Sequence, residues 1–195
     1  MASKRKVIIV TDGDKVAKRT VEVAAKNIGA RCISCSWGNP TRLAGEQLVE
    51  QITRAAHDPV VVMLDDKGIQ GEGAGEVALR YICEHSDIDV LGVVAVASNT
   101  EGVEGISVDE SVDNHGLILN GPVNKNGFCC IDGSTELHGD TVEVLRELQI
   151  PVIVGIGDIG KMCGFDDAQY GAPITTKALQ EVLNRSGYLG KNFSE

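Results

Sequence analysis

Short, almost wholly apolar runs alternate along this chain with stretches of helical periodicity, and this alternation constrains the fold more than any other feature. A run that is apolar at consecutive positions and rich in β-branched residues is typical of a strand covered on both faces. Such runs occupy residues 6–11, 30–34, 59–64, 90–97 and 151–156. Helices are expected over 15–28, from 39–41 onwards, over 76–85, up to about 148, and over 174–185. The rhythm predicts a parallel, doubly wound α/β sheet with helices on both faces.

Residues 99–132 depart from this rhythm, because they show no helical period. They carry two turn signals instead, Asp113–Asn114–His115–Gly116 and Asn126–Gly127, each flanked by residues that suit strands. We therefore expect a small β-hairpin insertion over about 99–132. With 195 residues the chain is long enough for one packed core, so 1–195 is expected to form a single α/β domain.

The balance of charges argues against several classes of partner. The chain carries 18 basic and 28 acidic side chains, a net charge of −10, and only 4% aromatic residues. Binding to nucleic acid needs clustered lysine and arginine or stacking aromatics, so no nucleic-acid partner is expected. The apolar runs are far shorter than the roughly 20 residues that span a bilayer, and no secretory signal is visible. We expect cytoplasmic synthesis, no direct membrane insertion, and reduced thiols at the six cysteines.

Aspartates follow three of the predicted strands. Asp12 and Asp14 follow the first, Asp65 and Asp66 the third, and Asp158 the last. Because ligands of an open parallel sheet bind outside the carboxyl ends of its strands, these five residues are candidate ligands of a Mg²⁺ or Ca²⁺ ion. The alternative is that Asp12 or Asp14 caps the helix that follows, as aspartate commonly does, and that Asp65 and Asp66 do the same for their loop.

Glycines in the loops after these strands are candidates for binding a small anion or a nucleotide through backbone amides. The candidate glycines are Gly13, Gly71, Gly73, Gly155, Gly157 and Gly160. The last three match G-x-G-x-x-G, but no later strand carries the acidic residue that would bind a ribose, which favours a tight turn instead. Trp37, the only tryptophan, is a candidate contact for a partner, and a lid on the core is the alternative.

Two catalytic patterns resemble the first strand and its loop. A haloacid dehalogenase phosphatase has strand-D-x-D followed by Gly-Thr, whereas Lys15 and Val16 follow here. "VIIVTDGDKVAKR" is more similar to the D-x-D strand and helix of Toprim proteins, so the sheet is expected to be Toprim-like or Rossmann-like. That family has a catalytic glutamate on an earlier strand, which this sequence lacks before Lys6. A Mg²⁺-dependent phosphoryl-transfer enzyme with a Toprim-like acidic site therefore stays as the alternative function.

Six longer segments together resemble one family. They read "VTDGDKVAKR", "SWGNPT", "LDDKGIQGEGAGEVAL", "DVLGVVAVASNT", "GIGDIGKM" and "GAPITTKAL". They are similar to the soluble AE proteins of the stage V sporulation A system of spore-forming Firmicutes, and the similarity runs from about Lys4 to Gly187.

The resemblance implies a non-enzymatic accessory subunit without catalytic residues. The system of that family moves dipicolinic acid, with Ca²⁺, into the forespore and out again at germination. The implied partners are the membrane-embedded subunits of the system. The implied place is the outer surface of the spore inner membrane, where the protein would be peripheral. A chain this acidic would be held there by protein partners, because anionic lipid repels it.

Overall fold

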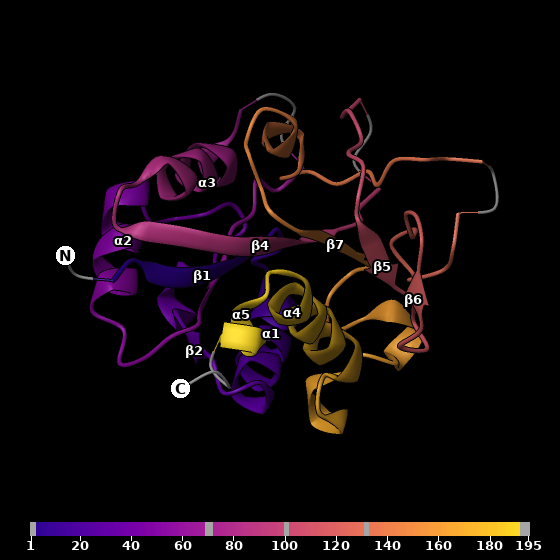
Figure 1. Ribbon diagram of the computed structural model, residues 1–195. Helices are drawn as coiled ribbons and strands as arrows, with labels where there is room; N and C mark the ends of the chain where they lie inside the picture. The colour runs from indigo at the N-terminus through magenta and orange to yellow at the C-terminus, as the bar shows by residue number, and fades with distance from the viewer. Residues whose placement is uncertain (1–2, 69–71, 100–101, 131–132, 192–195) are drawn as a thin grey trace.

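A computed structural model, described over residues 3–68, 72–99, 102–130 and 133–191, contains one seven-stranded sheet in the described part (Figure 1). The strands are β1 (Arg5–Val10), β2 (Arg31–Cys32), β3 (Val60–Met63), β4 (Ile88–Val96), β5 (Glu110–Val112), β6 (Ile118–Leu119) and β7 (Ile153–Ile156). Their order across the sheet is β2-β3-β1-β4-β7-β5-β6, and all neighbours are parallel except β5 and β6. The predicted doubly wound α/β fold is confirmed.

Helices cover both faces of this sheet, as Figure 1 shows. They are α1 (Lys15–Asn27), α2 (Gly45–Thr53), α3 (Ala74–Glu84), α4 (Pro173–Arg185) and α5 (Tyr188–Lys191). The pairs α2 and α3, and α1 and α4, each pack side by side. Four short 3-10 turns complete the described elements: η1 (Ser34–Ser36), η2 (Glu143–Arg146), η3 (Met162–Gly164) and η4 (Ala168–Tyr170).

The strands contribute side chains to two hydrophobic clusters, one on each face of the sheet. On β4, Val93 and Ala95 belong to the cluster with α2 and α3, whereas Val94 and Val96 belong to the cluster with α1 and α4. The alternation arises because successive side chains of a strand point to opposite faces. Both faces are buried, which explains why the strands read as unbroken apolar runs.

The parallel register brings the carboxyl ends of the central strands to one edge. Val10, the last residue of β1, lies opposite Met63 of β3 on one side and Val94 of β4 on the other. β4 is in turn aligned with β7, whose last residue Ile156 pairs with Val96. Loops that are distant in sequence therefore leave the sheet side by side at this edge, which we call the rim.

The predicted hairpin insertion is present, but it extends the main sheet. β5 and β6 pair antiparallel around the turn at 113–116, and β5 also pairs in parallel with β7. The second predicted turn, at Asn126–Gly127, is closed by an isolated bridge between Val123 and Cys129. The insertion joins the sheet because β5 is fully buried and its Val112 packs in the cluster of α1 and α4.

Three local predictions are wrong. The strand expected over 30–34 is only two residues long, since the chain turns into η1. The helix expected from 39–41 begins at Gly45, because the amide and hydroxyl of Thr41 are used to bond the backbone carbonyl of Asp65. The helix expected to end near 148 is only the 3-10 turn η2, whose Val144 amide donates to a side-chain oxygen of Glu76.

Two further features bear on the predictions. Among the described residues, the structure contains no helix of the length and apolarity needed to span a bilayer. No disulfide forms among the six cysteines, and the thiols of Cys35, Cys129 and Cys163 are exposed.

Candidate functional site

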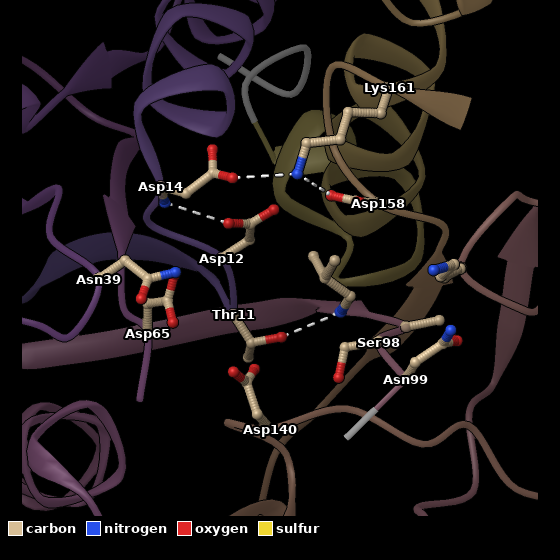
Figure 2. A pocket seen from close by; sticks show the side chains of 13 residues that line it. Thr11, Asp12, Asp14, Asn39, Asp65, Ser98, Asn99, Asp140, Asp158 and Lys161 are labelled. Carbon is tan, nitrogen blue, oxygen red and sulfur yellow. Dashed lines mark hydrogen bonds and ion pairs between the residues drawn. The ribbon is translucent and has the colours of Figure 1, made fainter. Parts of the chain in front are cut away.

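A polar pocket of about 210 Å³ opens at the rim (Figure 2). It is lined by Thr11, Asp12, Asp14, Asn39, Asp65, Val96, Ala97, Ser98, Asn99, Lys125, Asp140, Asp158 and Lys161. These residues come from the ends of β1, β3, β4 and β7 and from the loops beside them. The structure thus brings together four of the five predicted aspartates, all except Asp66.

Asp12 is a buried carboxylate of this pocket, with 8% of the residue exposed. One of its oxygens accepts a hydrogen bond of 3.2 Å from the backbone amide of Asp14. Burial, and then the negative charges of Asp14, Asp65 and Asp158, raise the pKa of Asp12 well above its ordinary value. A cation bound beside Asp12 would oppose this rise, because it favours the charged form of the carboxylate.

Asp14 is a helix cap and the partner of a lysine. Its Oδ1 accepts from the amides of Val16 and Ala17 at 2.7 and 2.8 Å, which satisfies the first turn of α1. Its Oδ2 lies 3.0 Å from Nζ of Lys161. Burial alone would raise the pKa of Asp14, but the bonds from the Ala17 amide and from Lys161 outweigh it and lower that pKa.

Lys161 also lies 2.9 Å from Oδ1 of Asp158, so one ammonium group bridges two loops at the mouth of the pocket (Figure 2). Burial works against the charged lysine, but the bonds to Asp158 and Asp14 raise its pKa overall. Lys161 thus neutralises both Asp14 and Asp158.

Asp65 and Asp66 are neighbours in sequence with different surroundings. Asp65 lines the pocket, accepts from the amides of Gly13 and Lys67 at 3.1 and 2.8 Å, and has its pKa raised to about 6 by burial. Asp66 is 0% exposed and accepts from the amides of Gly75 and Glu76 at the start of α3. Asp66 therefore caps a helix and does not line the pocket.

Several pocket residues were not among the predicted site residues. Asp140 accepts a hydrogen bond of 2.6 Å from the amide of Gly68, and Lys125 reaches the rim from the turn that holds Asn126 and Gly127. The backbone of Lys125 accepts from the amide of Asp158 at 2.7 Å, which ties the hairpin region to the loop after β7. Asp140 and Lys125 belong to segments that follow no predicted central strand. A search of the residues at strand ends could therefore not find them.

The arrangement does not fit a resident Mg²⁺ or Ca²⁺ ion. No group of three or more acidic, histidine or cysteine side chains is placed to hold a metal ion in the part of the chain that is described. The physical reason is that the backbone amides and Lys161 already use oxygens of Asp14, Asp65 and Asp158. Hard cations need several such oxygens converging at 2.0–2.6 Å, so no step is assigned to a metal here.

The predicted glycines lie where this chain contacts itself closely. A Cβ atom at Gly13 would approach the carbonyl oxygen of Gly38 to 2.7 Å, and one at Gly157 would approach the amide of Gly127 to 2.6 Å. Similar contacts face Gly73, Gly155 and Gly160, from Asp66, Ser111 and Thr20 respectively. Gly71 lies outside the described residues. These contacts agree with the tight-turn alternative for the G-x-G-x-x-G segment.

Trp37 is half-buried and packs against the cluster of α1 and α4. The charged ends of Lys18 and Arg42 lie over its ring, 5.0 and 4.6 Å from the centroid. These contacts fit the alternative in which the indole is a lid on the core, while its role as a partner contact stays a prediction.

Comparisons with known proteins agree with the family suggested by the sequence. The family model described as stage V sporulation protein AE1 matches residues 6–186. Comparisons with curated proteins and with solved structures found no match. The matched range contains the described strands except Arg5 at the start of β1, helices α1 to α4, and every residue of the rim pocket.

Proposed function

Because the chain belongs to the stage V sporulation protein AE1 family and is thus a sporulation-related protein, we propose that it is a non-enzymatic accessory subunit of the dipicolinic acid system at the spore inner membrane. In this proposal dipicolinic acid moves with Ca²⁺ through membrane-embedded subunits, and this protein binds to them at the outer surface of that membrane. The observation that carries the proposal is the match to the family over residues 6–186.

The chemistry of the rim pocket supports a role without catalysis. The oxygens of Asp14 and Asp65 act as acceptors for the protein's own amides, and burial raises the pKa of Asp12. A phosphoryl-transfer site of the Toprim type needs ionised carboxylates that are available to Mg²⁺. Five aspartates against two lysines also make the pocket a poor place for a phosphate ester.

The direct test is co-purification from spore inner membranes. A tagged protein, expressed at its natural level, is expected to enrich the membrane-embedded subunits of the stage V sporulation A system after gentle solubilisation. A strain that lacks those subunits is the matched control, and in it the protein should leave the membrane fraction. Failure of the tagged protein to enrich these subunits, or its retention in the membrane fraction of the strain that lacks them, would count decisively against the proposal.

The alternative enzyme rests on one observation, that Asp12 and Asp14 face the same pocket (Figure 2). Calorimetric titration with Mg²⁺ compares the unmodified protein with an Asp12→Asn, Asp14→Asn double variant. Our proposal expects no saturable heat from either protein. If Mg²⁺ bound only to the unmodified protein, and if that protein hydrolysed a phosphoester, the protein would be an enzyme and the accessory role would be refuted.

A further inference from the structure

The rim pocket contains more carboxylates than its lysines neutralise. Lys161 pairs with Asp14 and Asp158 at 3.0 and 2.9 Å, so these two aspartates already have a cationic partner. The other three aspartates that line the pocket form no ion pair with any described residue. They are Asp12, Asp65 and Asp140. Even with the charge of Lys125, the other lysine of the lining, this inner group keeps an excess of negative charge.

Asp12 has a carboxylate oxygen that the protein itself does not use. The residue is only 8% exposed. Its Oδ1 accepts from the backbone amide of Asp14 at 3.2 Å, whereas its Oδ2 receives no hydrogen bond from any described residue. Figure 2 shows this carboxylate directed into the pocket. A buried acceptor without a donor is destabilising, so Oδ2 offers a place for a donor that comes from outside the chain.

The two other unpaired aspartates add negative charge around Asp12. The charge of Asp65 helps to raise the pKa of Asp12, and the charge of Asp140 helps to raise the pKa of Asp65. Asp65 accepts one bond at each oxygen, from the amides of Gly13 and Lys67, but a carboxylate has about four lone-pair sites. A cation in the pocket would stabilise the charged form of all three carboxylates.

The geometry that excludes a metal ion admits an ammonium group. A hard metal ion needs several oxygens that converge at about 2.0–2.6 Å, and the described side chains provide no such group. An ammonium group has three N–H donors, each of which needs one lone pair at about 2.7–2.9 Å. It can therefore bind to the unused oxygen of Asp12 while the neighbouring carboxylates attract it over a longer distance.

A second acidic pocket, which we call the glutamate pocket, lies beside α3 and η2 and has a volume of about 350 Å³. Its lining is Glu72, Glu76, Arg80, Glu104, Glu143, Val144, Arg146 and Glu147. Arg80 pairs with Glu72 and Glu147, and Arg146 pairs with Glu104. Arginines of the protein thus neutralise much of this pocket, whereas the inner aspartates of the rim pocket have no such partner.

We propose that the rim pocket binds a primary ammonium group. The ammonium donates a hydrogen bond to Oδ2 of Asp12, and the charges of Asp65 and Asp140 hold it there. The volume of about 210 Å³ suits a small free amine or the end of a lysine side chain from a protein partner, and both carry this group. The assignment rests on the geometry of the pocket and does not depend on the accessory role.

Isothermal calorimetry on the full chain, in phosphate buffer that contains no amine, tests this proposal with three probes. Ethylamine represents a free amine, Nα-acetyllysine amide represents a lysine side chain, and tetramethylammonium carries the charge without any N–H donor. We expect saturable one-site binding of at least one of the first two, and at least about tenfold weaker binding of tetramethylammonium. The tighter of the first two probes identifies the source of the ammonium group. Equal affinity for tetramethylammonium would overturn the hydrogen bond to Asp12.

Two variants of the rim pocket should change the affinity in opposite directions. Asp12→Asn keeps the shape but removes the charge, so it should weaken binding by about tenfold or more. Lys125→Met removes a positive charge that repels the ligand, so it should strengthen binding several-fold. This second variant keeps the test decisive if circular dichroism shows that Asp12→Asn does not fold. Unchanged or weaker binding by Lys125→Met would overturn the proposal.

Two matched controls locate the site. Glu147→Gln removes one negative charge from the glutamate pocket, and Asp87→Asn removes one from an exposed position just before β4. Both variants should leave the affinity unchanged. Loss of binding in Glu147→Gln but not in Asp12→Asn would place the amine in the glutamate pocket and would overturn the proposal.

Failure of this proposal is distinct from failure of the proposed function. Absence of saturable binding by both primary amines would refute the rim pocket as an ammonium site. Co-purification with the membrane-embedded subunits could still succeed in that case. Conversely, binding of a primary amine without co-purification would leave the pocket assigned and the accessory role refuted.

Discussion

At the scale of single residues, buried carboxylates do much of the work of joining elements. Asp166 is 0% exposed and accepts from the amides of Gly160, Ile174 and Thr175 and from the hydroxyl of Thr175, at 2.6–3.0 Å. Burial raises its pKa, although these four bonds favour the charged form. The residue therefore holds the loop after β7 against the first turn of α4.

We expect Asp166→Ala to destabilise the protein by at least about 2–4 kcal/mol, because several buried donors would lose their acceptor. Urea unfolding followed by circular dichroism measures the change. Asp167→Ala, which removes one bond of 2.7 Å to the amide of Gln169 from a half-buried position, is the control and should change stability by about 1 kcal/mol or less. Equal effects of the two variants would contradict this role of Asp166.

Glu76 makes stability depend on pH. It is 3% exposed, its Oε1 accepts from the amide of Val144, and burial followed by the charges of Asp66, Glu143 and Glu72 raises its pKa from 4.5 to about 7. Between these two pKa values the folded state binds more protons than the unfolded state at this group. Its contribution to stability is therefore largest below about pH 4.5 and is lost as the pH rises through about 7.

Glu76→Gln should consequently stabilise the protein at about pH 8, by about 1–3 kcal/mol, and by much less near pH 5, since each pKa unit corresponds to about 1.4 kcal/mol. The amide oxygen of glutamine can still accept from Val144. Denaturant unfolding at the two pH values measures the difference, with Glu84→Gln, an exposed change on the same helix, as the control. A gain of the same size at both pH values would show that the ionisation of Glu76 is not its cause.

At the scale of elements, the helix ends differ in how well they are capped. Asp14 caps α1 with two bonds, whereas Ala44 stands at the same position of α2 and has no side-chain acceptor. Its backbone is extended, with φ −66° and ψ 157°, as a capping residue requires. Gln47 supplies part of the missing cap by accepting from the amide of Ala44 at 3.0 Å.

Ala44→Ser is therefore expected to stabilise the protein by about 0.5–1 kcal/mol, because the hydroxyl can accept from the amide of Gln47 in the first turn. Thermal unfolding should show a rise in Tm. Ala55→Ser, beyond the other end of α2, is the matched control and should stay within about 0.5 kcal/mol of the parent. An unchanged Tm in Ala44→Ser would mean that packing, and not the missing cap, determines the stability of this end of α2.

The elements that the sequence predicts well are those whose own side chains determine them. β1, β3, β4, β7, α1 and α4 follow from apolar runs or stripes that need burial, whatever surrounds them. The misplaced start of α2 and the missing helix before β7 depend on bonds from Thr41 to Asp65 and from Val144 to Glu76. Those partners are 24 and 68 residues away, so no local pattern could reveal them.

At the scale of the whole molecule, the rim pocket could be predicted only in part. Strand ends placed Asp12, Asp14, Asp65 and Asp158 at one edge because parallel strands share a direction. Lys161 neutralises two of them from the loop after β7, 147 residues from Asp14. Whether an aspartate faces the pocket, as Asp65 does, or caps a helix, as Asp66 does, depends on where the next helix begins.

The net charge of −10 leads to a prediction for the whole protein. The purified chain should not bind vesicles of anionic lipid at low salt, because the surface potential of such vesicles repels an acidic protein. Flotation with anionic vesicles, compared with neutral ones, measures this. Salt-sensitive binding to the anionic vesicles alone would indicate a direct lipid contact and would remove the need for protein partners at the membrane.

The exposed thiol of Cys163 lies in the turn η3 that leads to Phe165, whose ring meets that of His115 edge to face. With Cys35 and Cys129 replaced by serine, maleimide chemistry would attach a fluorescent dye preferentially at this one position. Such a labelled protein would report a partner that binds near this turn as a change in emission, without any assay of transport or germination.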